Sequence, residues 1–352
     1  MSERKEHLKK VGICGHFDGN KPTSSGQIIK TRIVTEELIR QLGKDQVMMV
    51  DSSGGAKAVP RMLKESWNLF KNCENVIFLP AYKGLRVFAP VYTFYNHFYH
   101  RKIHYVVIGG WLNRFIDKHE WLFDELRRFT GIYVETMNMK KVLEKRGLKN
   151  VVVMPNFKNL GILNPEQLSY TVEQPYKLCT FSRVMKEKGI EDAIGAVKKV
   201  NEKAGNTIYT LDIYGQIDND YKNEFEVLKN DFPNYVKYKG LVPYNKSVDV
   251  LKNYFALLFP TYYHGEGFAG TLIDAMAAGT PVIASDWRFN KEIVKPGLTG
   301  VLIKDCNSKK IEEELIKIAD NPNMWNAMKI TALDEAHKYK PEAAIKPLID
   351  KF

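Results

Sequence analysis

Cysteine is scarce in this chain of 352 residues, and no apolar run approaches the length of a membrane-spanning helix. The four cysteines, Cys14, Cys73, Cys179 and Cys306, are scattered without a short pair spacing, so the sequence predicts neither a disulfide framework nor a zinc site. The charged start, MSERKEHLKK, is not followed by an apolar core of signal-peptide length. We therefore expect reduced thiols and a cytoplasmic protein.

Motifs for metals and for dinucleotide cofactors are missing as well. The junction at residues 12–17 lacks the G-x-G-x-x-G pattern of dinucleotide-binding proteins, which argues against a nicotinamide enzyme. No cluster of metal ligands of the usual kinds is visible, and Asp218-Asn219-Asp220 is more typical of a helix start than of a cation site. The sequence therefore predicts no metal and no cofactor.

Positive charge is concentrated in the first half of the chain. Residues 1–160 contain 27 Lys and Arg against 15 Asp and Glu, a net charge of +12, whereas the remainder contains 25 against 26, a net charge of −1. A nucleic acid, an anionic lipid surface or an anionic substrate would each explain the excess, and so would solubility alone. Lys140-Lys141 with Lys145-Arg146 is one cluster that would be drawn to an anionic membrane.

Aromatic residues are dense between residues 86 and 123, where they alternate with Arg101, Lys102, Arg114 and Lys118. Such a mixture is found on faces that bind nucleic acid or lie at a membrane interface. The alternative is that these rings pack helices onto a sheet, which is the usual place for an aromatic side chain. The sequence leaves both interpretations open.

Short β-branched runs alternate with segments of helical length, which predicts parallel strands joined by crossover helices and an α/β fold. The first series of runs is VGICG, VMMV, NVIFLP, HYVVIG, IYVE and VVVMP, and the second is KLCTF, YTLDIYG, VKYKGLV, ALLFP, PVIAS and GVLI. A polar stretch with prolines, residues 156–175, separates them. We expect two facing Rossmann-like domains with a deep cleft between them: residues 1–165, residues 166–335, and a C-terminal helix over 336–352 that returns to the first domain.

Residues 260–281, PTYYHGEGFAGTLIDAMAAGTP, have the pattern of a strand end, a glycine loop and a helix N-terminus. Gly267 and Gly270 let the backbone approach a ligand, and the first helical N–H groups favour an oxygen-rich one. Glu266 and Asp274 flank this loop. Alternatively, Thr271 and Asp274 form a capping box, and the glycines serve only the turn.

Further polar residues follow other strands of the second series. Arg183 and Lys188 come after KLCTF, Gly215 after YTLDIY, and Val242 after VKYKG. Because the carboxyl ends of parallel strands share one edge of a sheet, we expect these positions to converge with Glu266. Two cations there suit a diphosphate, although an isolated Arg and Lys are more often solvated surface charges.

The chain resembles the retaining glycosyltransferases of family 4, which have the two-domain GT-B fold, and the resemblance covers nearly the whole chain. It is most specific in Glu266–Asp286, in Glu292-Ile293-Val294 with Gly297-Leu298-Thr299-Gly300, and in Phe181-Ser182-Arg183 with Lys188-Gly189. Ser285-Asp286-Trp287, Val134-Glu135-Thr136 and Met154-Pro155-Asn156 are similar to the branch that builds capsular and extracellular polysaccharides.

The resemblance implies transfer of a sugar, with its anomeric configuration kept, from a nucleotide diphosphate to a hydroxyl of a lipid-diphosphate-linked saccharide. Arg183 and Lys188 would neutralise the departing diphosphate without a metal, and Glu266 would hold the donor sugar. His16 and His104 are candidates for a first-domain histidine near the reacting sugar. The implied donor-binding residues are Gly26, Gly215, Val242, Gly267, Phe268, Ala269, Gly270, Thr271 and Asp274, of which Asp274 would bind the ribose in place of a family glutamate.

Two other functions stay open. An epimerase of similar fold would share the diphosphate site, and fold does not choose between the two. A nucleic-acid-binding protein without enzymatic activity would explain the basic, aromatic first half. The resemblance favours the transferase, with no nucleic acid partner and with a peripheral contact to anionic membrane.

Overall fold

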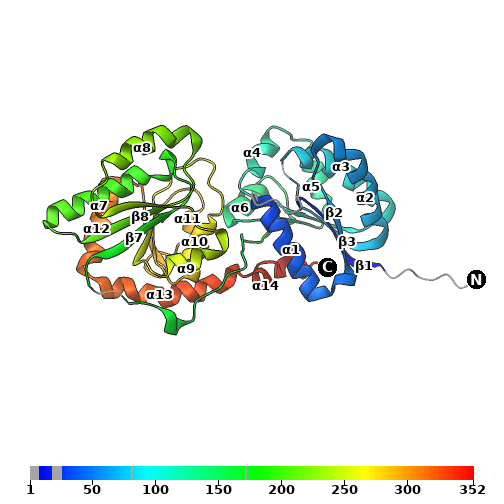
Figure 1. The fold of residues 1–352 in the computed structure, drawn as a ribbon. Helices are drawn as coiled ribbons and strands as arrows, with labels where there is room; N and C mark the ends of the chain where they lie inside the picture. The colour runs from blue at the N-terminus through cyan, green and yellow to red at the C-terminus, as the bar shows by residue number, and fades with distance from the viewer. Residues whose placement is uncertain (1–7, 18–25, 81, 171–172) are drawn as a thin grey trace, which may run out of the picture. The chain divides into compact units, whose positions relative to one another are not determined.

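The computed structural model describes residues 8–17, 26–80, 82–170 and 173–352, and the chain divides into two units. The first unit is Met1–Asn159 together with Lys340–Phe352, and the second unit is Leu160–Tyr339. Each unit contains one six-stranded sheet in which every pairing is parallel. The predicted α/β fold with two Rossmann-like units is therefore confirmed, and each predicted apolar run contains a strand (Figure 1).

The first sheet has the strand order β2-β1-β3-β4-β5-β6. Its strands are β1 (Lys9–Gly15), β2 (Val47–Asp51), β3 (Cys73–Phe78), β4 (Lys102–Val106), β5 (Gly131–Val134) and β6 (Val151–Val153). The helices of this unit are α1 (Gly26–Leu42), α2 (Val59–Asn72), α3 (Tyr82–Tyr99), α4 (Leu112–Asp117), α5 (Leu122–Arg127), α6 (Met137–Lys145), α14 (Pro341–Ala344) and α15 (Lys346–Ile349).

The side chains of β1 point alternately to the two faces of the first sheet, and a helix packs on each face. Val11 and Ile13 belong to the core that contains Val34 and Leu38 of α1. Gly12 lies on the opposite face, where a Cβ atom would come within 2.9 Å of the Leu69 side chain of α2. Successive side chains of a strand point to opposite faces, so helices are needed on both, as a parallel sheet requires.

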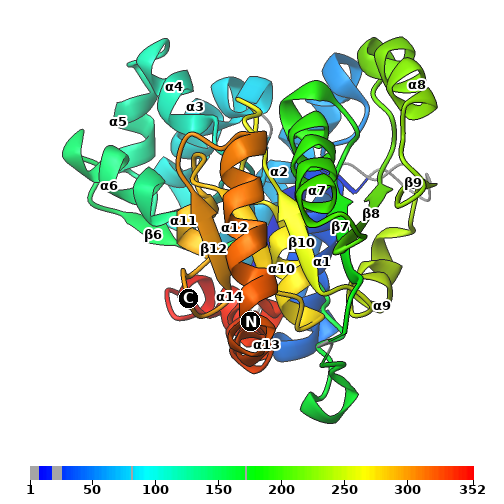
Figure 2. The same ribbon diagram turned by 90° about the vertical axis from the view of Figure 1, so that its left-hand side faces the viewer.

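The second sheet has the order β12-β11-β10-β7-β8-β9. Its strands are β7 (Tyr176–Phe181), β8 (Tyr209–Tyr214), β9 (Val236–Gly240), β10 (Ala256–Phe259), β11 (Val282–Ser285) and β12 (Gly300–Ile303). Its helices are α7 (Ile190–Ala204), α8 (Lys222–Asn230), α9 (Ser247–Leu251), α10 (Gly270–Ala277), α11 (Asn290–Ile293), α12 (Ser308–Asp320) and α13 (Pro322–Ala336). Figure 2 shows α7 and α12 side by side over one face of this sheet, with α10 beyond it.

The strand order of the second sheet decides where a ligand can bind. From β7 the chain moves outward through β8 and β9, then returns to the other side of β7 with β10. Doubly wound sheets bind ligands outside the carboxyl ends of the two strands at such a reversal. The loops that follow β7 and β10 are therefore the place to look for a site.

The division between the units differs from the predicted boundaries at both ends. The second unit begins at Leu160 because Leu160 and Ile162 pack on its core and the Leu163 amide donates to the Ala277 carbonyl at 3.0 Å. The C-terminal segment over 336–352 is not one helix. Residues 337–339 form a 3₁₀ turn of the second unit, whereas the segment that contains α14 and α15 buries Ala344, Ile345 and Leu348 in the first unit's core.

Candidate functional site

A polar pocket of about 270 Å³ lies at the carboxyl edge of the second sheet, where the loops after β7 and β10 meet. Sequence reasoning had predicted that residues from these two loops would converge. The pocket is lined by Ser182, Arg183, Met185, Lys188, Phe259, Tyr263, Glu266, Ala269, Gly270 and Thr271. Six of these ten, namely Arg183, Lys188, Glu266, Ala269, Gly270 and Thr271, are predicted site residues.

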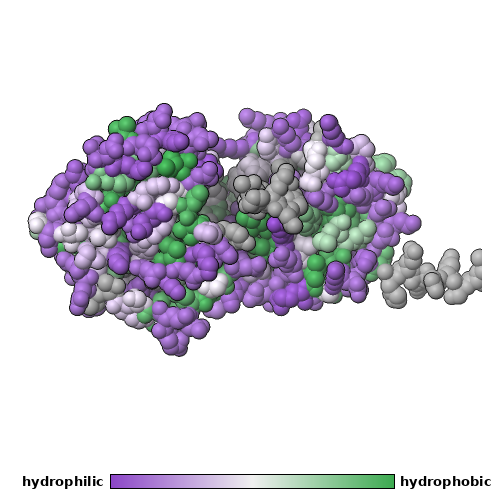
Figure 3. Space-filling view, in the orientation of Figure 1, coloured by the Kyte–Doolittle hydropathy of each residue, from purple (hydrophilic) through white to green (hydrophobic). Residues whose placement is uncertain are grey.

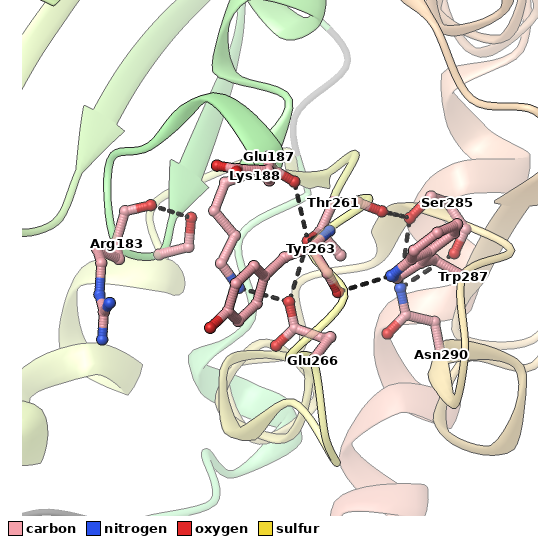
Figure 4. Close-up of polar contacts among 10 residues, drawn as sticks. Arg183, Glu187, Lys188, Thr261, Tyr263, Glu266, Ser285, Trp287 and Asn290 are labelled. Atoms are coloured by element: carbon pink, nitrogen blue, oxygen red, sulfur yellow. Dashed lines mark hydrogen bonds and ion pairs between the residues drawn. The ribbon is translucent and has the colours of Figure 1, made fainter. Parts of the chain in front are cut away.

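The centre of the pocket is an ion pair between the Lys188 ammonium and the Glu266 carboxylate (Figure 4). Their side chains are 10% and 11% exposed, and both residues line the pocket. The Lys188 nitrogen also lies 5.2 Å from the centroid of the Tyr263 ring and 5.5 Å from that of Phe259. A buried cation held by one carboxylate and two ring faces is well placed to meet a second, incoming anion.

The Glu266 carboxylate is held in place by a chain of hydrogen bonds. The Thr261 hydroxyl donates to the same Glu266 oxygen at 3.0 Å, and the Tyr263 amide donates to that hydroxyl at 3.2 Å. Further back, Ser285 donates to the Thr261 carbonyl, and the Trp287 indole donates to the Tyr263 carbonyl at 2.8 Å. The loop after β10 is therefore tied to the loop after β11, which limits the orientations open to Glu266.

Gly189 and Gly215 are required by close approaches between the loops. Gly189 has a φ of +70°, and a Cβ atom there would lie 2.4 Å from the Pro260 carbonyl oxygen, so the β7 and β10 loops touch. Gly215 has a φ of +137°, and a Cβ atom would lie 1.7 Å from the Ser182 carbonyl oxygen. Any other residue would push the loops apart at either position, because L side chains rarely adopt these conformations.

Helix α10 points its N-terminus into the pocket. Its N-cap residue is Ala269, which has no side-chain oxygen to bond the first helical N–H groups. Gly270 and Thr271, the first two helical residues, line the pocket. The N-terminal end of a helix attracts anions and oxygen-rich groups, and here no N-cap side chain competes for them.

Two predicted site residues, Asp274 and Arg183, are not arranged as expected. Asp274 is the fifth residue of α10 and only 3% exposed, and it is not among the lining residues. The capping-box interpretation is wrong, because the N-cap residue is Ala269 rather than Thr271. Arg183 lines the pocket, but its guanidinium pairs with Asp218 at 3.4 Å and is directed away from Lys188 in Figure 4.

The remaining donor-binding predictions lie around this pocket without lining it. Gly215 follows β8, Val242 packs on the second unit's core beyond β9, and Gly267 lies in the loop before α10. The Phe268 ring is buried 5.6 Å from that of Tyr339. Gly26 is the exposed first residue of α1 in the other unit. Their contacts with a donor remain predictions.

The two candidate histidines have different environments. His104 lies in β4, fully buried, with its ring nitrogens 2.9 Å from the Tyr133 hydroxyl and 3.1 Å from the Asn75 amide oxygen. Burial lowers the pKa of His104 to about 3, so this imidazole is neutral and serves the core. His16 follows β1 and lines a separate pocket of the first unit. Of the two, His16 alone remains a candidate for contact with a substrate.

Sequence reasoning missed the residues that support the ion pair, chiefly Thr261, Tyr263 and Ser285. Thr261 and Tyr263 lie in the same stretch as the predicted Glu266, PTYYHGEG. Their position in this turn-prone loop is the sequence feature that could have indicated them. Sequence separation hides the contact with Ser285, which stands 24 residues beyond Thr261. Within the described residues there is no group of three or more His, Cys, Asp or Glu arranged to hold a metal ion.

Comparison with protein families gives a match in the second unit. Residues 167–334 match the family described as Glycosyl transferases group 1. Over 202 residues, 56% of the chain, it is 26% identical to the Streptococcus gordonii UDP-N-acetylglucosamine–peptide N-acetylglucosaminyltransferase GtfA subunit. Over 172 residues, 47% of the chain, it is 24% identical to the Erwinia amylovora amylovoran biosynthesis glycosyltransferase AmsK. The matched segments span only 38% and 42% of these relatives.

A solved structure extends the likeness to nearly the whole chain. Anabaena Alr3699/HepE, determined in complex with UDP, superimposes with a TM-score of 0.72 over 97% of this chain and 98% of that one. The identity is 13%, so this match demonstrates the fold, which is GT-B. No helix in the described ranges combines the length and the hydropathy needed to cross a bilayer.

Proposed function

Because residues 167–334 form a glycosyl transferases group 1 domain, we propose that the protein transfers a sugar from a nucleotide-diphosphate sugar to an acceptor hydroxyl. The observation that supports this most is the Lys188–Glu266 pair, set in a pocket at the strand reversal and beside the N-terminus of α10. A cation, a carboxylate and helical N–H groups are the partners that a diphosphate and a sugar need. One of the compared proteins has a name that begins with UDP-N-acetylglucosamine, and another was determined in complex with UDP, so uridine diphosphate sugars are the first donors to test.

The proposed reaction makes a specific demand on Lys188 and Arg183. The bond between the sugar's anomeric carbon and the diphosphate oxygen breaks, the acceptor oxygen bonds to that carbon, and the acceptor proton leaves. Negative charge grows on the diphosphate as the bond breaks, so a cation beside it stabilises the transition state more than the ground state. Lys188 is already oriented, whereas Arg183 would exchange its partner Asp218 for the diphosphate.

Glu266 and α10 are proposed to hold the donor sugar. The carboxylate accepts hydrogen bonds from sugar hydroxyls with the oxygen that Lys188 and Thr261 do not occupy. We propose that the anomeric configuration is retained and that no metal is required, because Lys188, Arg183 and the helix N-terminus supply positive charge to the diphosphate. Asp274 is proposed to bind the donor ribose.

We propose a saccharide linked to a lipid diphosphate as the acceptor, with the protein in the cytoplasm and in peripheral contact with anionic membrane. The similarity to an amylovoran biosynthesis glycosyltransferase supports a polysaccharide product. The GtfA relative is named for a peptide acceptor, so a peptide belongs in the acceptor panel. An epimerase would interconvert the donor sugar without releasing the nucleoside diphosphate.

The test is a donor panel with the full chain, in which release of the nucleoside diphosphate and the anomeric configuration of the product are measured with and without EDTA. The proposal predicts release from one donor, a retained configuration and no effect of EDTA. The same donor at a hundred times its dissociation constant should stabilise the protein by about 2.7 kcal/mol. Epimerised donor without release, or stabilisation by RNA instead of any donor, would contradict the proposal.

A further inference from the structure

Helix α3 of the first unit carries an apolar stripe that no part of the described chain covers. Val87, Phe94 and Phe98 are spaced along one helical face, and their exposed fractions are 43%, 61% and 55%. Phe94 and Phe98 are the only phenylalanines of the described ranges in the exposed class. Together with Trp67 of α2, these residues are called the aromatic face below. Figure 3 shows hydrophobic residues reaching the surface of the first unit on the side that carries α2 and α3 in Figure 1.

The rings of the aromatic face pack on one another rather than on the sheet. The centroids of the Phe94 and Phe98 rings are 5.3 Å apart, and the angle between the ring planes is 80°. The Trp67 ring contacts Phe98 at 5.8 Å and, edge to face, Tyr95 at 4.9 Å and Tyr99 at 5.0 Å. Ring faces that already meet the edges of other rings leave little room to stack a nucleobase, which is how aromatic side chains hold single-stranded nucleic acid.

The surroundings of the aromatic face are basic. No Asp or Glu stands between Glu74 and Asp117, a stretch that contains all of α3. Exposed Lys83 and Arg86 lie on α3, and exposed Lys64 and Lys71 lie three residues before and four after Trp67, on the same side of α2. Apolar rings framed by cations complement a surface that is apolar inside and anionic outside.

The aromatic face also adjoins an apolar cavity. Val87 and Lys83 line the pocket that His16 also lines, which has a volume of about 380 Å³ and walls that include Met62, Phe78 and Phe88. Val87 is therefore shared by the exposed stripe and the cavity. A lipid acyl chain next to the stripe could therefore pass over Val87 into the cavity without leaving apolar surroundings.

The basic cluster on α6 offers less to an anionic surface. Lys140 pairs with Glu144 at 3.7 Å, and Arg146 pairs with Asp117 at 2.7 Å. Exposed charges that already have partners gain little from a second anion. The structure therefore favours α3 over the cluster that the sequence first indicated.

We propose that the aromatic face is a docking surface for an anionic phospholipid bilayer. Phe94, Phe98 and Val87 enter the boundary between headgroups and acyl chains, and Trp67 lies at headgroup depth. The lysines and Arg86 contact lipid phosphates. This inference rests on the proposed membrane contact, but vesicle binding needs no sugar donor, so either proposal can fail without the other.

The test is co-sedimentation of the full chain with phosphatidylcholine vesicles, with and without 30 mole per cent phosphatidylglycerol. Binding should need the anionic lipid and should weaken between 0.1 and 1 M salt, because the screening length falls from about 10 Å to about 3 Å. Phe94→Gln with Phe98→Gln should lower the partition coefficient by about tenfold or more, because two apolar side chains no longer enter the lipid. Lys64→Gln, Lys71→Gln and Arg86→Gln together should remove most of the preference for anionic lipid.

Two matched controls separate docking through the aromatic face from nonspecific adsorption to the vesicles. Met324→Gln with Ile330→Gln removes exposed apolar residues from α13 of the second unit and should leave vesicle binding unchanged. Lys140→Gln with Arg146→Gln, at α6 and its C-cap, should lower binding less than twofold, because both charges already pair with carboxylates. Circular dichroism and the melting temperature of each variant report on folding.

A second measurement locates the contact. The chain has five tryptophans, so quenching by brominated lipid is compared between the parent and Trp67→Phe, and the difference should contain most of the quenched signal. The inference is overturned by an absence of vesicle binding, by unchanged binding of the phenylalanine variant, or by loss of binding in the α6 variant alone. A homodimer that the phenylalanine variant dissociates, or tight binding of single-stranded RNA at this face, would equally overturn it.

Discussion

Among the residues that the structure describes, each unit buries one Lys–Glu pair near the carboxyl edge of its sheet, and the two pairs differ in what surrounds them. In the first unit Lys30 of α1 meets Glu135 after β5 at 2.7 Å, with side chains 3% and 5% exposed. Lys30 also donates to the Val107 carbonyl at 3.3 Å and lies 5.6 Å from the Phe157 ring centroid. In the second unit the Lys188–Glu266 pair opens onto a polar pocket.

The comparison shows that an ion pair acquires a chemical role through access rather than through its own geometry. Lys30 and Glu135 neutralise each other's charge, and because both side chains are buried, neither is accessible to a ligand. Lys188 and Glu266 line a pocket next to the N-terminus of α10, which is where the proposed diphosphate would bind. We therefore assign a structural role to the first pair and propose a chemical role for the second.

Breaking the first pair should have the largest effect. Lys30→Met leaves the Glu135 carboxylate buried without a cation, and we expect a loss of about 3–5 kcal/mol in the free energy of unfolding. The measurement is urea denaturation of the full chain. Lys30→Met combined with Glu135→Leu should recover most of the loss, because a buried pair replaced by apolar residues costs little. A loss below about 1 kcal/mol in the single variant would remove the contrast between the pairs.

Breaking the second pair should affect turnover instead. Lys188→Met and Arg183→Ala should each lower turnover with saturating donor by about 100-fold, equivalent to about 2.7 kcal/mol. Stability should change less than in the Lys30 variant, because Glu266 can still reach water through the pocket. Lys186→Met, an exposed neighbour, is the control and should keep the parent rate. Parent turnover in both site variants would show that the diphosphate lies elsewhere.

His104 offers a test of the first unit's stability that leaves the second unit unchanged. Its folded-state pKa of about 3 lies below the usual 6.5 because burial disfavours the charged ring. Its contribution to stability is therefore complete above pH 6.5 and is lost as the pH falls toward 3. Between pH 7 and pH 5 the loss should be about 2 kcal/mol. The pH dependence of unfolding is compared between the parent and His104→Gln, and equal slopes would contradict the assignment.

The smallest predicted effect separates the two carboxylates of the second unit. Glu266→Gln should lower turnover, whereas Asp274→Asn should raise the donor's dissociation constant by about tenfold and leave turnover nearly unchanged, as expected for an interaction equal in ground and transition states. Donor titrations and steady-state kinetics measure both. Asp274→Asn keeps a similar shape and one accepting side-chain oxygen, but it replaces the other oxygen with an NH₂ donor. Unchanged donor affinity with reduced stability would assign Asp274, which is buried in α10, a structural role.

Much of the site was predictable because local patterns place residues on strand ends. The apolar runs before Arg183 and Glu266 are strands β7 and β10, and parallel strands bring their carboxyl ends to one edge. The glycine loop before α10 was recognisable for the same reason. The resemblance to family 4 then assigned roles to Lys188 and Glu266 that periodicity and spacing did not.

Local pattern along the chain determined the α/β class, the positions of the strands and the edge of the second sheet at which the candidate site residues converge. Tertiary structure decided that Lys188 pairs with Glu266. It likewise decided that Arg183 pairs with Asp218, that Asp274 is buried and that Thr261 and Tyr263 orient the Lys188–Glu266 pair. It also decided which rings between residues 86 and 123 enter the core, as Tyr92 and Tyr105 do, and which stay outside, as Phe94 and Phe98 do. Spacing tells which residues share a helical face, but burial depends on the elements that pack against that face, and these come from distant parts of the chain.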